Sequence, residues 1–112
     1  MIEAHKITEH ASLLSHQRYA EVVGEDRSYI ALAQDVIANE INATGGTIGE
    51  QAWMRLLAQP WNRIRQEMLA DTPEGRLLRS NSPFSRIIGI RDPQTRRQLW
   101  RQAKHDLSAA MI

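Results

Sequence analysis

Apolar residues recur at helical spacing along most of the chain, and this pattern predicts a mainly α-helical protein. A first apolar stripe predicts a helix over residues 8–23. A wider stripe begins after Asp26 and predicts a central core helix, because so broad an apolar face requires neighbours on several sides. Shorter stripes predict helices over residues 47–58 and 60–71, and a long terminal helix follows Asp92-Pro93.

Capping residues stand at several of the predicted helix starts. Thr47 and Glu50 have the spacing of a capping box, in which each side chain satisfies a free backbone amide of the other residue. One further device recurs, a capping side chain followed by Pro at the first helical position. It occurs at Thr72-Pro73, Ser82-Pro83 and Asp92-Pro93.

Residues 75–91 are compatible with two structures. A β-hairpin would place strands on either side of a Ser-Asn-Ser-Pro turn, but adjacent leucines break the period-two alternation that a strand requires. Phe84, Ile87 and Ile88 instead have the spacing of one helical turn. Short helices are therefore favoured. The expected fold is one compact bundle of about five to seven helices, with a small winged-helix-like hairpin at 75–91 as the alternative.

Length and composition narrow the class of protein. The 112 residues fit a single domain, and 42% hydrophobic with 24% charged residues is ordinary for a globular protein. The chain has no cysteine, which excludes disulfides and thiolate chemistry. Neither a signal peptide nor an apolar run that could span a membrane is visible. We expect a soluble cytoplasmic protein with no membrane partner.

The net charge of +1 conceals two halves of opposite charge. Residues 1–54 carry three basic and eight acidic side chains, a net charge of −5. Residues 55–112 carry eleven basic and five acidic side chains, a net charge of +6, and ten of the eleven are Arg. Such asymmetry is typical of nucleic-acid contact. The alternative is that the two halves attract each other, within a monomer or between the subunits of a homodimer.

No motif in the chain indicates a reaction. The Gly-rich segment 45–49 lacks both the Lys-Ser/Thr ending and the preceding strand of a phosphate-binding loop. His5 and Glu9 stand one helical turn apart, as two metal ligands do, but no further ligand completes a site. We therefore expect no catalytic residues, no metal and no cofactor, and no enzyme activity.

The last predicted helix carries a positive stripe. Arg97, Arg101 and Lys104 follow one another at helical spacing, opposite the apolar line of the same helix. Three stacked cations with no acid between them repel, by a few tenths of a kcal/mol per pair. An anionic partner would relieve this repulsion.

The helices predicted over 47–58 and 60–71, followed by a basic hairpin, resemble the winged helix-turn-helix proteins. In that arrangement Asn62, Arg63 and Gln66 would face outward near the start of the second helix, where such side chains read base edges and phosphates. The resemblance covers about residues 47–92. The chain departs from that pattern because the turn has no glycine and Met54 stands where a small residue is usual.

These observations predict a small DNA-binding protein that regulates transcription, with the C-terminal half as its contact surface. Asn62, Arg63 and Gln66 would reach the groove, and six basic residues would hold phosphates. The six are Arg76, Arg79, Arg86, Arg97, Arg101 and Lys104. The alternative is a small inhibitor or adaptor, of the kind that mobile elements encode, which binds another protein through an Arg/Trp surface around Trp100.

Overall fold

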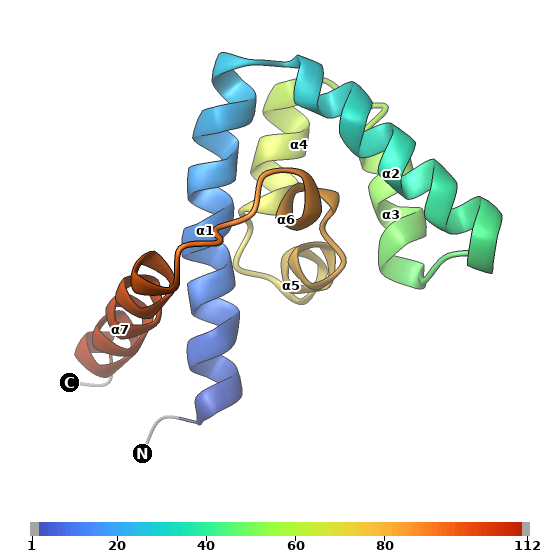
Figure 1. Cartoon of the computed structure of the whole chain (residues 1–112). Helices are drawn as coiled ribbons and strands as arrows, with labels where there is room; N and C mark the ends of the chain where they lie inside the picture. Colours follow the sequence, from blue (N-terminus) through green and yellow to red (C-terminus); the bar gives the residue numbers. More distant parts are fainter. Residues whose placement is uncertain (1–2, 111–112) are drawn as a thin grey trace.

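The computed structural model describes residues 3–110, which form seven α-helices and no β-strand (Figure 1). The mainly helical fold predicted from apolar spacing is therefore confirmed. The helices are α1 (Ala4–Glu25), α2 (Ser28–Thr44), α3 (Ile48–Leu56), α4 (Trp61–Met68), α5 (Pro73–Ser80), α6 (Pro83–Ile87) and α7 (Pro93–Ala110).

The capping residues begin α3, α5 and α6 where the sequence predicts. The Thr47 backbone N–H donates to the Glu50 carboxylate at 2.9 Å, and the Glu50 N–H donates to the Thr47 hydroxyl at 3.0 Å. Thr72 and Ser82 accept backbone N–H groups at the starts of α5 and α6, each just before a Pro. These local bonds define three helix starts independently of tertiary packing.

The hairpin alternative for residues 75–91 is wrong. The segment forms α5 and α6, and Phe84, which would have lain near the hairpin turn, is completely buried. The two capping residues and the helical spacing of the apolar side chains both favour helix, and no competing strand pattern overrides them. Gly89, with φ of 64°, follows α6 in a left-handed conformation that suits glycine.

The first helix is longer than its apolar stripe predicts. It begins at Ala4 rather than at residue 8, so Thr8 lies inside the helix, where its hydroxyl donates to the Ala4 carbonyl at 3.1 Å. It also continues through Gly24 to Glu25. This long helix therefore has room for contacts with the helices of the core and, in addition, with α7.

The core is built from α1 to α6. Trp53 is fully buried at its centre, its indole N–H donates to the Leu78 carbonyl at 2.6 Å, and its ring meets Phe84 edge-on at 5.5 Å between centroids. The other large apolar side chains of this central cluster that are completely buried are Val23, Ile37, Ile64 and Met68. A single cluster of apolar side chains thus joins these six helices.

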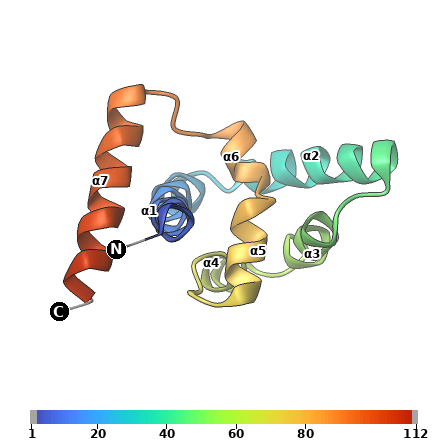
Figure 2. The same cartoon turned by 90° about the horizontal axis from the view of Figure 1, so that it is seen from below.

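The last helix lies beside this core rather than in it. Among the described helices, the extensive contacts of α7 are all with α1 (Figure 2). Leu99 and Ala103 are buried in that contact but belong to a separate apolar patch from the central cluster. The molecule is consequently elongated, with principal extents of 44 × 28 × 25 Å.

Candidate nucleic-acid interface

The outer face of α7 carries the positive stripe that the sequence predicts. Asp92 begins this helix by accepting the Thr95 N–H at 3.1 Å, and Leu99 and Ala103 bury the opposite face against α1. A period of 3.6 residues then directs Arg97, Arg101 and Lys104 away from α1, and all three are exposed. We call these three residues the α7 basic face.

The cations of the α7 basic face have no acidic partner. None of the three forms an ion pair within residues 3–110. Lys104 lies over the ring of Trp100, with its ammonium 5.9 Å from the ring centroid, and Trp100 is 40% exposed. The face therefore combines uncompensated positive charge with an aromatic surface, a combination that suits an anionic partner.

The single acid of α7, Asp106, points to α1 instead of to the basic face. Asp106 accepts a hydrogen bond from Gln102 at 2.7 Å and meets His10 of α1 at 3.1 Å. The hydrogen bond from Gln102, and then the one from His10, lower the pKa of Asp106 below its usual value. Asp106 thus helps to hold α7 on α1 while leaving the outer face without negative charge.

The predicted groove-reading residues lie on a different side of the molecule. Asn62, Arg63 and Gln66 are exposed on α4, as expected. Arg63 is paired with Glu67 at 3.2 Å, and the Asn62 side chain accepts the Arg63 backbone N–H at 3.0 Å. In both views α1 stands between α4 and α7 (Figures 1 and 2). The structure therefore does not combine these residues with the α7 basic face in one surface.

The helix-turn-helix arrangement predicted for residues 47–71 differs from the one observed. In the described chain α3 and α4 share at most a marginal contact, and α5 packs against both of them. The two helices therefore do not pack directly on each other but both pack on α5, and no β-wing follows among residues 3–110. The apolar periodicity of the sequence correctly predicts the two helices but not how they pack. Their packing depends on contacts with α5, which follows them in the chain.

Two of the predicted phosphate ligands form ion pairs within the chain. Arg76 meets Asp71 at 3.0 Å. Arg86 lies between two acids of the N-terminal half, 3.1 Å from Glu40 and 3.5 Å from Glu50. The attraction between the acidic and basic halves that the sequence allowed is thus present at Arg86, although the α7 basic face takes no part in it.

Arg79 is a structural residue, and its burial argues against a phosphate contact. Its side chain is 5% exposed and donates from Nη1 to the carbonyls of Met68 at 2.9 Å and Ala70 at 2.8 Å. These bonds fasten α5 to the end of α4. Helical spacing indicates this inward position, because Arg79 lies on the same face of α5 as Gly75 and Leu78. All three residues are buried in the structure.

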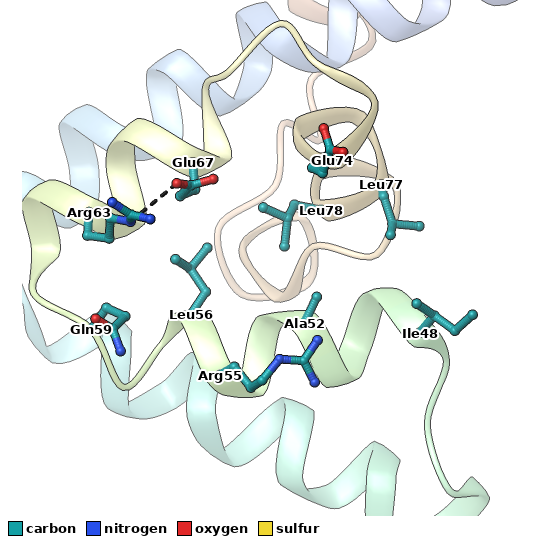
Figure 3. Close-up of a pocket in the computed structure, with 10 residues that line it drawn as sticks. All are labelled: Ile48, Ala52, Arg55, Leu56, Gln59, Arg63, Glu67, Glu74, Leu77 and Leu78. Carbon is teal, nitrogen blue, oxygen red and sulfur yellow. Dashed lines mark ion pairs between the residues drawn. The ribbon is translucent and has the colours of Figure 1, made fainter.

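Sequence reasoning did not identify a cleft of about 620 Å³ where α3, α4 and α5 meet (Figure 3). Two exposed aliphatic side chains, Ile48 and Leu77, stand at one end of it. The sequence does contain a signal that Ile48 is exposed. Ile48 directly follows the capping Thr47, and it does not belong to the apolar stripe that α3 buries.

The described residues show no other site of recognisable chemistry. Within residues 3–110 no three His, Asp or Glu side chains are grouped so that they could hold a metal ion, and His5 instead meets Glu3 at 3.3 Å. None of the helices between residues 3 and 110 combines the length and the apolar composition that a membrane-spanning segment requires. The chain matches no protein-family model, no curated protein and no solved structure in the comparisons made.

Proposed function

We propose that the protein is a small regulatory protein that binds nucleic acid through the backbone phosphates, with the α7 basic face as the contact. The observation that supports this is the group of three exposed cations that face solvent together and have no ion-pair partner in the described chain. Phosphates attract such a group strongly and without regard to base sequence. The proposed activity is binding rather than catalysis.

The groove-reading role of Asn62, Arg63 and Gln66 is a separate part of the proposal. These side chains are exposed on α4 and chemically able to contact bases. Because α1 lies between α4 and α7, a duplex that follows α7 would have to bend around the molecule to reach them. We therefore assign affinity to the α7 basic face and leave base recognition by α4 as a dependent hypothesis.

The test is fluorescence anisotropy of a labelled duplex of mixed sequence, titrated with protein at several salt concentrations. Three neutralised phosphates predict a slope of about −2.7 in log affinity against log salt. Removing two of the cations, in the variant Arg97→Gln with Arg101→Gln, should reduce the slope to about −0.9.

A matched control removes two exposed arginines from other helices, Arg18→Gln on α1 and Arg65→Gln on α4. This control has the same net charge as the α7 variant, so it should keep the slope of the unmodified protein. The proposal fails if the duplex does not bind at low salt, or if both double variants lose affinity equally.

A second function is favoured by Trp100. An exposed Trp flanked by Arg is the combination that most often anchors protein interfaces, so the same face suits an acidic surface of another protein. Absence of duplex binding at low salt would favour this inhibitor or adaptor function. Partner capture that depends on both Trp100 and Arg101 would then support it.

A further inference from the structure

The cleft between α3, α4 and α5 is open and apolar at its base. Ala52 and Leu56 of α3 and Leu78 of α5 line it, because α3 and α4 both pack against α5 and scarcely contact each other. Its volume of about 620 Å³ is sufficient to receive several side chains. Apolar surface left open in this way gains free energy when a partner covers it.

Two aliphatic side chains stand at the same end of the cleft, on opposite sides of it. Ile48 begins α3 and is 75% exposed, and Leu77 of α5 is 39% exposed (Figure 3). Ile48 is the more exposed of the two and makes little contribution to the core of its own chain. Each side of the cleft thus offers a protruding apolar group next to an apolar floor.

The charges along the cleft are arranged with opposite signs on its two sides. Arg55 lies on the α3 side, whereas Glu67 and Glu74 lie on the side formed by α4 and α5 (Figure 3). Within residues 3–110 neither Arg55 nor Glu74 has an ion-pair partner, while Glu67 is paired with Arg63. The two unpaired charges do not form an ion pair with each other within one chain, and both are exposed and available to another molecule.

We infer that a second copy of this chain covers the cleft by contacting its two sides, and that the protein forms a two-fold symmetric dimer across it. A two-fold axis along the cleft sets the α3 side of one copy against the α4–α5 side of the other. Ile48 then meets Leu77 of the second copy, and Arg55 meets Glu74 of the second copy. Both contacts occur twice, as a symmetric interface requires, and the charges on the two sides of the cleft are complementary to those of a second copy.

This inference does not rest on the proposed function. The α7 basic face does not line the cleft, so it stays accessible in the dimer. A dimer would present two such faces, which raises the effective concentration of the second contact once the first has formed. Dimerisation is measured without any nucleic acid, so its failure and the failure of nucleic-acid binding are distinguishable.

The first test is light scattering on a size-exclusion column, with sedimentation equilibrium from low-micromolar to submillimolar protein. The unmodified protein should be a dimer at the upper end of this range. Ile48→Glu should raise the dimer dissociation constant at least about tenfold, because it places a charge in the apolar contact. The variant should remain folded, since Ile48 is exposed and an acid in the first helical turn is favourable there.

The matched control is Leu32→Glu. Leu32 is 49% exposed on α2 and does not line the cleft, so the same chemical change should leave the dissociation constant unaltered. Circular dichroism of both variants checks that the helices remain. A loss of dimer that is equal in the two variants would overturn the proposal, because it would show an effect of charge in general rather than of the cleft.

The second test exchanges the paired charges. Arg55→Glu and Glu74→Arg should each weaken the dimer, because each places like charges opposite one another in both symmetric contacts. The double variant restores opposite charges and should recover most of the affinity that either single variant loses. A monomer throughout the concentration range, a dimer indifferent to Ile48→Glu, or a double variant no tighter than the single ones would each overturn the inference.

Discussion

Helices α6 and α7 differ in the opposite sense in length and in burial: the shorter helix is part of the core and the longer one lies beside it. The five residues of α6 include Phe84, which is completely buried against Trp53 at the centre of the core. The eighteen residues of α7 bury only Leu99 and Ala103. The difference lies in the neighbours, because α6 packs against α1 and α2 whereas the main contacts of α7 are with α1 alone in the described chain. The core and α7 should therefore respond differently to substitution.

The arginines of the two regions differ in the same way. Arg79, beside the core, donates to two backbone carbonyls and is almost inaccessible. Arg101, on α7, is exposed and has no acidic partner within residues 3–110. Buried polar groups stabilise a fold by satisfying one another, while exposed unpaired charges add little to stability and are free for binding.

The largest effect is expected at the centre of the core. Trp53→Ala should lower the free energy of unfolding by about 3–5 kcal/mol, because it leaves a cavity and removes the hydrogen bond to the Leu78 carbonyl. Urea denaturation followed by circular dichroism measures this change. Trp100→Ala on α7 is the control and should cost less than about 1 kcal/mol, since that side chain is 40% exposed. Equal costs would contradict the distinction between the core and α7.

The second effect is a dependence of stability on pH at His16. This side chain is 1% exposed, and burial lowers its pKa to about 4, against 6.5 when it is unfolded. The unfolded state therefore binds a proton first as the pH falls, so stability is complete above pH 6.5 and decreases towards pH 4. The total loss is about 3 kcal/mol.

The measurement for His16 is urea denaturation at a series of pH values between 7 and 4, in comparison with His16→Leu. The leucine variant fills the same buried position with an apolar side chain that cannot be protonated. Its stability should therefore fall less across this interval than that of the unmodified protein. Parallel curves for the two proteins would show that other groups cause the loss.

The third effect should be confined to α7. Leu99→Ala should weaken the contact between α7 and α1 by about 2 kcal/mol, because it removes one of the two side chains buried there. Hydrogen exchange should be faster in α7 and unchanged in α3 to α5. Faster exchange throughout the chain would instead show that α7 unfolds together with the core.

The smallest effect on stability is expected on the α7 basic face. Arg97→Gln with Arg101→Gln should change the free energy of unfolding by no more than about 0.5 kcal/mol. At low salt the double substitution should slightly raise the free energy of unfolding, because it removes the repulsion between like charges one turn apart. Thermal unfolding at low and high salt tests this. A marked destabilisation would show that these arginines have structural partners.

The parts of the fold that depend on neighbouring residues could be predicted from the sequence. Thr47 with Glu50 and the three pairs of capping residue and Pro give their helix starts, because capping involves only atoms a few residues apart. The orientation of the α7 basic face also follows from local spacing. In each case the controlling interaction lies within one helix.

The remaining features depend on contacts between distant segments. Arg86 is paired with Glu40 across 46 positions of the chain, and no periodicity within either helix predicts that meeting. The packing of both α3 and α4 on α5, rather than on each other, likewise results from tertiary contacts. The nine predicted contact residues therefore divide into exposed, paired and buried groups that the sequence pattern alone did not distinguish.

The three tryptophans differ in their exposure to solvent, so their fluorescence can report separately on the core, on its edge and on α7. Trp53 is fully shielded, Trp61 lies half-buried under Arg27, and Trp100 is open beside Lys104. Emission from the shielded indole should be blue-shifted and protected from iodide, whereas the open one should emit further to the red and be quenched readily. A ligand seated on the last helix would therefore suppress the quenchable fraction of the fluorescence while the blue component stays constant.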